Sequence, residues 1–303
     1  MYTIIVTGAD GQLAQCIKEN LKVKVNNNIN YIFLNRKEMD ITNKNNILEI
    51  FEKYNPKIVV NCAAYTNVDK AENEDYEVAC KINIDGVENL AFFCKAKNCL
   101  LLHISTDYVY DGNLNYPYVD NSACVPQNVY GRTKLYGDEK IKFSGCNYLI
   151  FRVSWLYSNK GKNFYNKIIE KIVKKDKTIY SSIDEISSPT NANYFAKAII
   201  AINEKYCNND INEQLLNNIY HYSDLGLCSR YDFAISIQDF VHNYTYISEY
   251  ASIIACNKNI FKTNAKRPYY TVLDCKKTKE AFPFIEFNYW RDNLEKEIKK
   301  YFE

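Results

Sequence analysis

Short β-branched runs and amphipathic helical segments alternate through the first half of this 303-residue chain. Residues 3–8, TIIVTG, predict a strand that ends in glycine, and residues 12–21, QLAQCIKENL, repeat apolar side chains at helical spacing. The pairing recurs, with strands predicted at 31–35, 57–64, 100–106 and 148–154, and helices at 45–54, 75–97 and around residue 130. Strands that are apolar along their whole length and alternate with helices predict a parallel sheet covered on both faces. The predicted fold class is therefore α/β, with a Rossmann-type doubly wound parallel sheet.

The alternation weakens beyond Trp155, where the predicted elements become shorter and mixed. We expect a dinucleotide-binding Rossmann domain over residues 1–155 and a smaller mixed α/β domain over 156–303 that mainly binds substrate. The run IYHY, residues 219–222, is a candidate strand, and some segments of the second part are expected to return to the Rossmann sheet. No stretch rich in Pro, Gly or Ser separates the two parts, which predicts that they pack directly against each other.

Charge and composition argue against several classes of partner. Lys and Arg number 38 against 36 Asp and Glu, so the formal net charge of +2 is too small for bulk attraction to nucleic acid or a membrane. No apolar run approaches the ~18 residues of a membrane span, and the first residues lack the basic region of a signal peptide, so we expect a cytoplasmic protein. The eleven cysteines form no C-x-x-C pair and only three histidines are present, so neither a disulfide framework nor a metal site is indicated. Small molecules are the expected partners.

The turn after the first predicted strand reads TGADGQLA and places Gly8, Gly11 and Ala14 at the spacing of a dinucleotide-binding loop. Gly8 would permit the tight turn, Gly11 would let backbone amides approach a pyrophosphate, and Ala14 would let the helix lie close to the strand. The helix N-terminus would then face the anion. A plain structural turn can carry the same glycines, so a turn without a ligand is the alternative.

The end of the second predicted strand indicates which dinucleotide is bound. An acidic residue here would hold the adenosine ribose of NAD, but the sequence has Asn35 and Arg36. A guanidinium offers a bidentate fork to the 2′-phosphate of NADP, so NADPH is the expected cofactor, with NADH as the alternative. Arg36 could instead be a solvated surface residue.

Tyr130 and Lys134 lie four residues apart in the segment NVYGRTKLYGDEK and therefore share one face of a predicted helix. An ammonium beside a phenol stabilises the phenolate, so Lys134 is expected to lower the pKa of Tyr130 and make it a usable acid near neutral pH. The fourth predicted strand ends in Thr106 and Asp107, at the edge where open α/β sheets bind ligands. A hydroxyl there can bind a carbonyl oxygen while Tyr130 donates its proton. The pair alone also fits an amphipathic helix with a solvated lysine.

Six runs of the sequence together resemble one family. They are GADGQLA (8–14), VVNCAAYTNVDKAE (59–72), STDYVYDGN (105–113), NVYGRTKLYGDEK (128–140), FRVSWLY (151–157) and AKRP (265–268). In order and spacing they resemble the extended short-chain dehydrogenase/reductase family, and within it the dTDP-4-dehydrorhamnose reductases, over nearly the whole chain. The resemblance implies NAD(P)H-dependent reduction of the C4 keto group of dTDP-4-dehydro-L-rhamnose to dTDP-L-rhamnose, a step of nucleotide-sugar biosynthesis.

The resemblance also implies roles for individual residues. Tyr130 would be the general acid, Lys134 would orient the nicotinamide ribose, and Thr106 would bind the C4 carbonyl of the sugar. The further cofactor contacts that it implies are Gly11, Gln12 and Leu13 at the pyrophosphate, Asp40 and Ile41 at the adenine end, and Ala63, Ala64 and Tyr65 on the nicotinamide side.

Three more residues are candidates for substrate binding. Trp155 would lie against the deoxysugar, or else be a buried aromatic after the fifth strand. Asp107 would bind a sugar hydroxyl, or else cap its turn. Arg267 would contact a nucleotide phosphate, or else be a surface arginine.

The resemblance leaves partners and alternative functions open. Some family members form a metal-bridged dimer through glutamates, but this sequence has Gln15 and Asn193 at the matching places, so no metal is expected and a homodimer stays an option. The sugar could carry dTDP or UDP. A 4,6-dehydratase or 4-epimerase on the same scaffold is one rival, although a dehydratase would need further acid–base residues beside Asp107. A non-catalytic NADP-binding regulatory subunit, like the β subunit of methionine adenosyltransferase, is the other, and the intact catalytic candidates argue against it.

Overall fold

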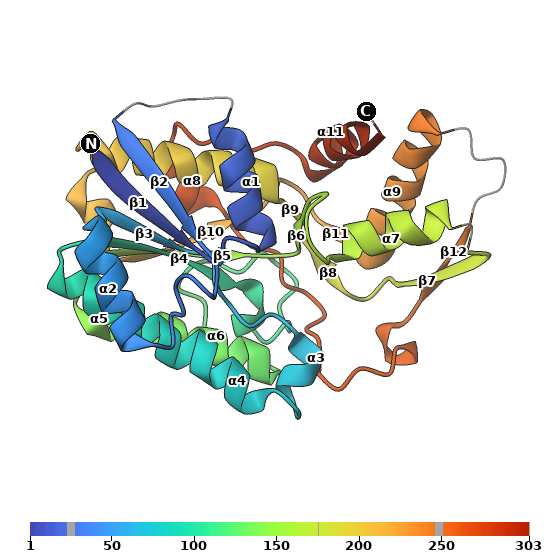
Figure 1. Cartoon of the computed structure of the whole chain (residues 1–303). Coiled ribbons are helices and arrows are strands. Elements are labelled where there is room, and N and C mark those ends of the chain that lie inside the picture. The colour runs from blue at the N-terminus through green and yellow to red at the C-terminus, as the bar shows by residue number, and fades with distance from the viewer. Residues whose placement is uncertain (23–27, 175, 246–250, 303) are drawn as a thin grey trace.

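The computed structural model describes residues 1–22, 28–174, 176–245 and 251–302. Its centre is a six-stranded parallel sheet with the order β2-β1-β3-β4-β5-β10 (Figure 1). The strands are β1 (Tyr2–Thr7), β2 (Ile29–Leu34), β3 (Ile58–Asn61), β4 (Leu100–Thr106), β5 (Tyr148–Val153) and β10 (Asn218–Tyr222). This confirms the predicted doubly wound parallel sheet, and the run IYHY lies in its edge strand β10. Across the described ranges, no helix is both long and apolar enough to cross a lipid bilayer.

Alternate side chains of each strand enter different cores, as a sheet covered on both faces requires. In β1, Ile4 and Val6 face one core and Ile5 faces the other. Helices α1 (Gln12–Leu21) and α8 (Ala192–Cys207) cover the first core, and α2 (Lys44–Tyr54), α5 (Gly86–Ala96) and α6 (Val129–Ser144) cover the second (Figure 1). The second half of the chain thus supplies one covering helix, α8, and one strand, β10, to this layered unit.

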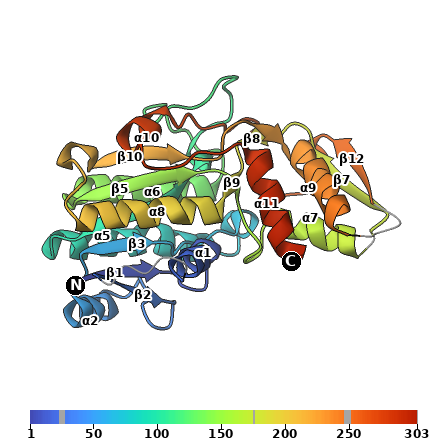
Figure 2. The ribbon, with the colours of Figure 1, turned by 90° about the horizontal axis from the view of Figure 1, so that it is seen from above.

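A smaller core lies beside the carboxyl edge of the sheet (Figure 2). Its helices are α7 (Phe164–Val173), α9 (Arg230–Tyr244) and α11 (Trp290–Phe302), and its strands β7 (Thr178–Ser182) and β12 (Ser252–Cys256) pair in parallel. The short elements nearby are β6 (Leu156–Tyr157) paired with β9 (Thr190–Asn191), β8 (Ile186–Ser187) paired with β11 (Cys228–Ser229), and α10 (Lys276–Ala281) beside β10. Single 3-10 turns lie at Asp107–Val109, Glu213–Leu215 and Lys258–Ile260. Ile169, Phe233 and Leu294 join the three helices in this core.

The helix predicted over residues 75–97 is present but contains a wider turn. The elements are α3 (Val68–Ala71), α4 (Tyr76–Cys80), a π-helical turn over Lys81–Asp85 and then α5. The wide turn carries the buried Asn83, whose carboxamide donates to Thr133 Oγ1 at 3.0 Å and to Tyr65 O at 3.1 Å and accepts from the Tyr65 amide at 2.9 Å. The wider turn therefore places the side-chain amide of Asn83 between the loop after β3 and helix α6. Such π turns are frequent at functional sites.

Candidate functional site

The loop after β1 has the backbone geometry of an anion-binding turn. Gly8 has a φ of +64°, and a Cβ there would lie 2.9 Å from Ala63 Cα, so glycine alone fits. Gly11 precedes α1 and donates its N–H to Gly8 O at 2.8 Å, and no side chain of the described residues caps the first turn of α1. The amides at this end of the helix can therefore receive a phosphate group.

The first residues of α1 link this loop to the smaller core. Leu13 is buried, whereas Gln12 Oε1 accepts a hydrogen bond from Asn163 Nδ2 at 2.7 Å. The same Asn163 amide donates to the carbonyls of Ser158 and Lys160 at 2.9 and 3.0 Å. The segment 158–163 is thus tied to the N-terminus of α1, beside the expected pyrophosphate position.

We predict that Gly8→Ala removes most NADPH affinity. The added methyl would press on Ala63 backbone that is fixed by the sheet, and the left-handed φ adds strain of about 1–3 kcal/mol. Fluorescence titration should show Kd for NADPH rising by roughly tenfold or more, which corresponds to about 1.4 kcal/mol.

Gly145→Ala is the matched control for Gly8→Ala. Gly145 also has a positive φ, +74°, but its Cβ would meet only the flexible Lys95 side chain, at 3.1 Å. We expect this variant to lower Tm and leave Kd unchanged. An equal loss of affinity in both variants would contradict the local explanation.

The residues expected at the adenine end lie together after β2. The side chain of Asn35 accepts from two amides of its own turn, at 2.9 and 3.2 Å, and Ile41 is buried. Burial works to raise the pKa of Asp40, but hydrogen bonds from Thr42 and the charge of Arg36 outweigh it and lower that pKa. Arg36 is 72 % exposed and its Nε lies 3.8 Å from Asp40 Oδ2. Because an exposed ion pair of this kind is worth little, Arg36 can leave Asp40 for a 2′-phosphate.

The residues expected on the nicotinamide side lie in the loop after β3. The Ala63 amide donates to Asn61 Oδ1 at 3.2 Å, and Tyr65 is held through both its amide and its carbonyl by Asn83. Ala64 is half-buried between them. The loop is therefore pinned at both ends before any ligand binds, and Asn83 is a supporting residue that sequence reasoning missed.

Tyr130 and Thr106 meet at the carboxyl end of β4. Asn128 caps α6 by accepting from the Gly131 amide at 2.8 Å, and a Cβ at Gly131 would clash with Tyr108 O, which keeps the helix close to β4. The Thr106 side chain lies close enough to the Tyr130 hydroxyl to oppose the rise in its pKa, and Thr106 Oγ1 accepts from the Tyr108 amide at 3.2 Å and donates to Asp107 Oδ1. The structure thus brings together two of the three predicted catalytic residues as a pair of hydroxyls.

Lys134 lies one turn further along the same face of α6 and is 2 % exposed. Its Nζ donates to Ile104 O at 2.7 Å and lies 3.2 Å from His103 Nε2. Burial lowers the pKa of Lys134 to about 8, with the charge of Asp138 opposing that effect. We expected Lys134 to lower the pKa of Tyr130, and the structure does not meet that expectation. Burial instead raises the pKa of Tyr130 to about 12, and Lys134, whose ammonium donates to Ile104 O of β4, is not among the groups that shift it.

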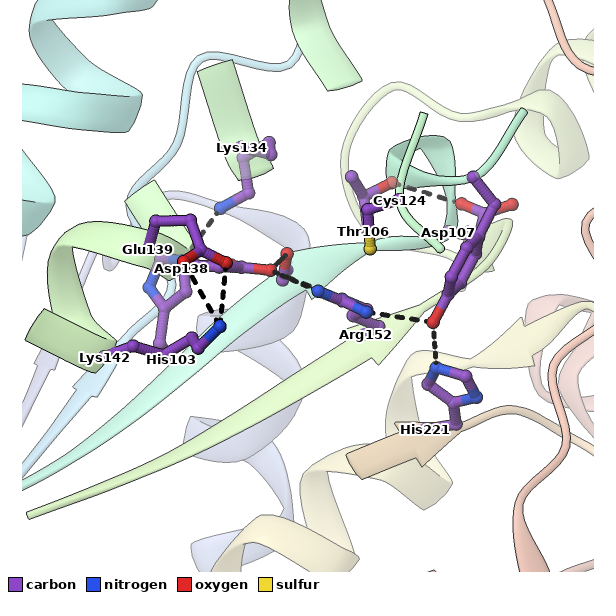
Figure 3. A network of polar contacts seen from close by, with 12 residues as sticks. His103, Thr106, Asp107, Cys124, Lys134, Asp138, Glu139, Lys142, Arg152 and His221 are labelled. Carbon is purple, nitrogen blue, oxygen red and sulfur yellow. Dashed lines mark hydrogen bonds and ion pairs between the residues drawn. The ribbon is translucent and has the colours of Figure 1, made fainter. Parts of the chain in front are cut away.

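A buried polar network lies beneath this lysine, and sequence reasoning missed it (Figure 3). Asp138, one further turn along α6, accepts from Nε and Nη2 of Arg152, both at 3.3 Å. Arg152 Nη1 donates to the Tyr110 hydroxyl at 2.9 Å, and this hydroxyl lies 2.7 Å from His221 Nε2. The acid four residues after Lys134 and the arginine in FRVS were visible signals. Charged residues are, however, expected at the surface unless paired.

Trp155 and Arg230 form a second side of the site. Trp155 follows β5 with a φ of +41°, a left-handed conformation that strains a bulky residue and marks candidate functional positions. Its ring lies against the Arg230 guanidinium, whose Cζ is 3.6 Å from the Trp155 ring centroid. The centroid of the Phe164 ring is 4.8 Å from the same Cζ. Arg230 begins α9, far from Trp155 in sequence, and no spacing rule could have connected the two.

Asp107 is buried between these two sides. Its Oδ1 accepts from Thr106 Oγ1 at 3.1 Å, and its Oδ2 has no hydrogen-bond partner among the described residues. Burial raises the pKa of Asp107 to about 6, although the Thr106 hydrogen bond and the charge of Arg230 oppose the shift. A buried carboxylate oxygen without a partner is a place that a ligand hydroxyl can satisfy.

A groove of about 1070 Å³ runs along the smaller core. Seven basic side chains line it against three acidic ones; the basic residues are Lys162, Lys167, Lys171, Arg230, Lys258, Lys266 and Arg267. The Arg267 guanidinium is paired with Asp69 through two contacts, of 2.7 and 3.3 Å. Arg230 reaches both the groove and Trp155. The groove therefore attracts anions and adjoins the Trp155 side of the site.

Amide side chains stand at the two positions where a bridging metal would need glutamates. Asn193 Nδ2 donates to Glu297 Oε2 at 2.9 Å, and Gln15 Nε2 donates to Asp10 O at 2.7 Å. Within the described ranges, no three His, Cys, Asp or Glu side chains are grouped so that they could hold a metal ion. The carboxylate of Glu297 is thus satisfied by an amide.

The parallel sheet, the glycine turn after β1 and the Tyr–Lys helix after β4 define the class of the protein. They are the arrangement of a nicotinamide-dependent oxidoreductase of the short-chain dehydrogenase/reductase type. The chain belongs to the RmlD substrate binding domain family, whose model matches residues 2–302.

Individual relatives extend this result over the whole chain. A dTDP-4-dehydrorhamnose reductase from Aggregatibacter actinomycetemcomitans is 33 % identical over 304 residues, with 100 % of each chain covered. The crystal structure of a dTDP-4-dehydrorhamnose reductase from Clostridium acetobutylicum is 31 % identical with a TM-score of 0.87 and 99 % of each chain covered. That of a dTDP-4-dehydrorhamnose reductase from Bacillus anthracis in complex with NADP is 28 % identical with a TM-score of 0.87, covering 99 % of this chain and 100 % of that one. The family resemblance expected from the sequence is confirmed.

Proposed function

We propose that this chain reduces the C4 keto group of dTDP-4-dehydro-β-L-rhamnose with NADPH to give dTDP-β-L-rhamnose, in nucleotide-sugar biosynthesis. The observation that carries the proposal is the hydroxyl pair of Tyr130 and Thr106 at the carboxyl end of β4, with the amine of Lys134 beneath it. The three relatives described above are dTDP-4-dehydrorhamnose reductases and match over their full length.

The loop after β1 fits the cofactor. The turn at Gly8 leaves no room for a Cβ, and the backbone amides at the N-terminus of α1, which no side chain caps among the described residues, suit a pyrophosphate. When bound, NADPH supplies the hydride that reaches the C4 carbon of the sugar. The residues that would hold it are Gly8, Gly11, Gln12, Leu13, Asn35, Arg36, Asp40, Ile41, Ala63, Ala64, Tyr65, Tyr130 and Lys134.

Tyr130 acts as the general acid. Burial keeps its phenol protonated, with the pKa raised to about 12, so at neutral pH it donates a proton to the oxygen that develops at C4. The Thr106 hydroxyl binds the same oxygen. Negative charge grows on that oxygen only in the transition state, so these two donors stabilise the transition state more than the ground-state ketone. Lys134 orients the nicotinamide ribose.

The smaller core supplies the substrate side of the site. Trp155 covers the deoxysugar, and the unpartnered Oδ2 of Asp107 accepts from a sugar hydroxyl. Arg230 and the basic groove bind the diphosphate, and Arg267 would join them by exchanging Asp69 for a phosphate. Residues 156–303 would accordingly be the part that mainly binds substrate, except for β10, which is in the sheet, and α8, which covers one face of it.

The reaction is expected to take place in the cytoplasm, and a homodimer is an option for the assembly of the protein. All eleven cysteines carry free thiols, which fits a reducing compartment. The homodimer stays a prediction, and sedimentation velocity measures it directly.

The test is a turnover assay. Purified protein should oxidise NADPH in the presence of dTDP-4-dehydro-6-deoxyglucose and a 3,5-epimerase, with dTDP-L-rhamnose as the product, and faster than it oxidises NADH or acts on the UDP-linked ketosugar. Copurified NAD with no net oxidation would indicate a dehydratase or epimerase. NADPH binding without turnover of either ketosugar, together with capture of a synthetase partner, would indicate a regulatory subunit.

A further inference from the structure

Asp138 is a buried charge beside Lys134 that the mechanism above does not use (Figure 3). It is fully buried on the face of α6 that carries Tyr130 and Lys134, one turn below the lysine. Its Oδ2 accepts from Ser105 Oγ at 2.9 Å and from Arg152. Its Oδ1 has no hydrogen-bond partner among the described residues and lies 3.8 Å from His103 Nε2. One carboxylate oxygen is therefore anchored, and the other faces the histidine that contacts Lys134.

The hydrogen bonds around His103 determine where its ring proton lies. Asn61 Oδ1 accepts from the Ala63 amide, so the Asn61 nitrogen faces His103 Nδ1, at 3.0 Å. This nitrogen must then be the acceptor, and the neutral ring carries its proton on Nε2. That N–H lies between Lys134 Nζ, at 3.2 Å, and Asp138 Oδ1, at 3.8 Å. The distance to Asp138 Oδ1 is too long for a hydrogen bond, so the carboxylate acts on this part of the site by its charge.

Asp138 is the one anion among the titratable groups that face Lys134 in the described structure. From α6 this group is Asp138, from β4 His103, and after β3 Cys62. Burial raises the pKa of the Cys62 thiol to about 12 and holds that of His103 well below its usual range, so both are neutral near pH 7. Arg152 forms an ion pair with Asp138 from β5 at 3.3 Å, and its charge opposes the rise in the pKa of Asp138 that burial causes.

We propose that Asp138 is a positioning residue whose charge keeps Lys134 protonated and in place beneath Tyr130, with the His103 ring between the two side chains. A buried amine without an anion loses its proton, since low polarity disfavours the charged form. Only one consequence of the proposal rests on the proposed function: Lys134 reaches the nicotinamide ribose as an ammonium.

The test is a titration of Lys134 by NMR in protein labelled with 13Cε-lysine, with the resonance assigned by its absence in Lys134→Arg. Wild type should titrate near the lowered pKa of about 8. In Asp138→Asn the midpoint should fall by about one pH unit or more, because the opposing charge is gone. Glu139→Gln is the matched control: it removes a carboxylate from the next residue, where it is partly exposed and bonds Lys142 at 3.0 Å. It should leave the midpoint unchanged, and an unchanged midpoint in Asp138→Asn would overturn the proposal.

A second variant guards against loss of the fold. Asp138→Asn/Arg152→Met removes both partners of the buried ion pair, and Arg152 is not among the groups that shift the pKa of Lys134. The midpoint of Lys134 should fall in this variant as well, and a normal midpoint would again overturn the proposal. In turnover by Asp138→Asn, the alkaline limb of the pH profile of kcat should move to lower pH by the same interval. Asp138→Glu should reverse part of that shift. A shifted midpoint in a protein that reduces no ketosugar would uphold the role of Asp138 and reject the reductase function.

Discussion

Tyr130→Phe is expected to lower kcat roughly 10²–10⁴-fold, the range that a positioned general acid contributes. The substitution keeps the ring, which packs edge-on to Tyr108 with centroids 6.0 Å apart, and removes only the hydroxyl near Thr106. Binding of NADPH should therefore change little, because the glycine turn and the α1 amides are untouched. Steady-state kcat and a fluorescence titration of NADPH separate the two effects.

Tyr136→Phe is the matched control for this prediction. Tyr136 lies on the same helix, is 55 % exposed and undergoes the same chemical change, so its kcat should equal that of wild type. Thr106→Val provides a second point, since it removes the other hydroxyl of the pair and should lower kcat while KM for NADPH stays the same. Undiminished turnover by Tyr130→Phe would show that the proton comes from another group.

The sheet was predictable because its signal is local. β1 and β4 each carry a run of apolar residues, IIV and LLL, and the turn at Gly8 needs a backbone that only glycine supplies. Residues 219–222 were a candidate strand in the sequence, but its place beside β5, and that of α8 on the sheet, were covered only by the expectation that some later segment would return. β10 pairs with β5 and α8 packs on α1, and both contacts join residues far apart in sequence. No periodicity in the sequence encodes which later segment returns to the sheet.

In the candidate site, too, the residues with a local sequence signal were predictable and those placed by distant contacts were not. Tyr130, Thr106 and Lys134 follow from helix spacing and from the end of a strand, and the structure brings the Tyr130 and Thr106 side chains together, with Lys134 one turn further along α6. The direction of the Lys134 ammonium did not follow, because it depends on Ile104 O and His103, which β4 supplies from 30 and 31 residues away. Arg230 was hidden for the same reason, since its contact with Trp155 is set by how the two cores meet.

Buried charge was the hardest feature to predict. Asp138 and Arg152 look like ordinary surface residues in the sequence, because reading charge as exposure is correct for most positions. They are buried because Asp138 on α6 and Arg152 on β5 pair with each other between the two elements. The glycine loop, in contrast, needs no distant contact to be recognised.

Arg152→Met should reduce the free energy of unfolding by about 3–5 kcal/mol, because it leaves the Asp138 carboxylate buried without its cation. The two side chains are 2 % and 0 % exposed. Burial already raises the pKa of Asp138 above its usual 3.8, and loss of Arg152, the largest opposing influence, raises it further. The folded state then binds a proton more tightly than the unfolded state, so stability falls as pH rises from the unfolded pKa to the folded one. The loss relative to wild type should be larger at pH 8 than at pH 5.

Denaturant unfolding of a mutant cycle distinguishes the ion pair from packing. Arg291→Met makes the same change at an exposed pair with Asp239, where the side chains are 44 % and 52 % exposed, and should cost less than about 1 kcal/mol. The double variant Asp138→Asn/Arg152→Met should be more stable than the sum of the two single losses predicts, since neither partner is then left charged and alone. Additive losses, or a loss in Arg152→Met that does not depend on pH, would mean that the arginine stabilises the fold by its contacts with Tyr110 rather than by its charge.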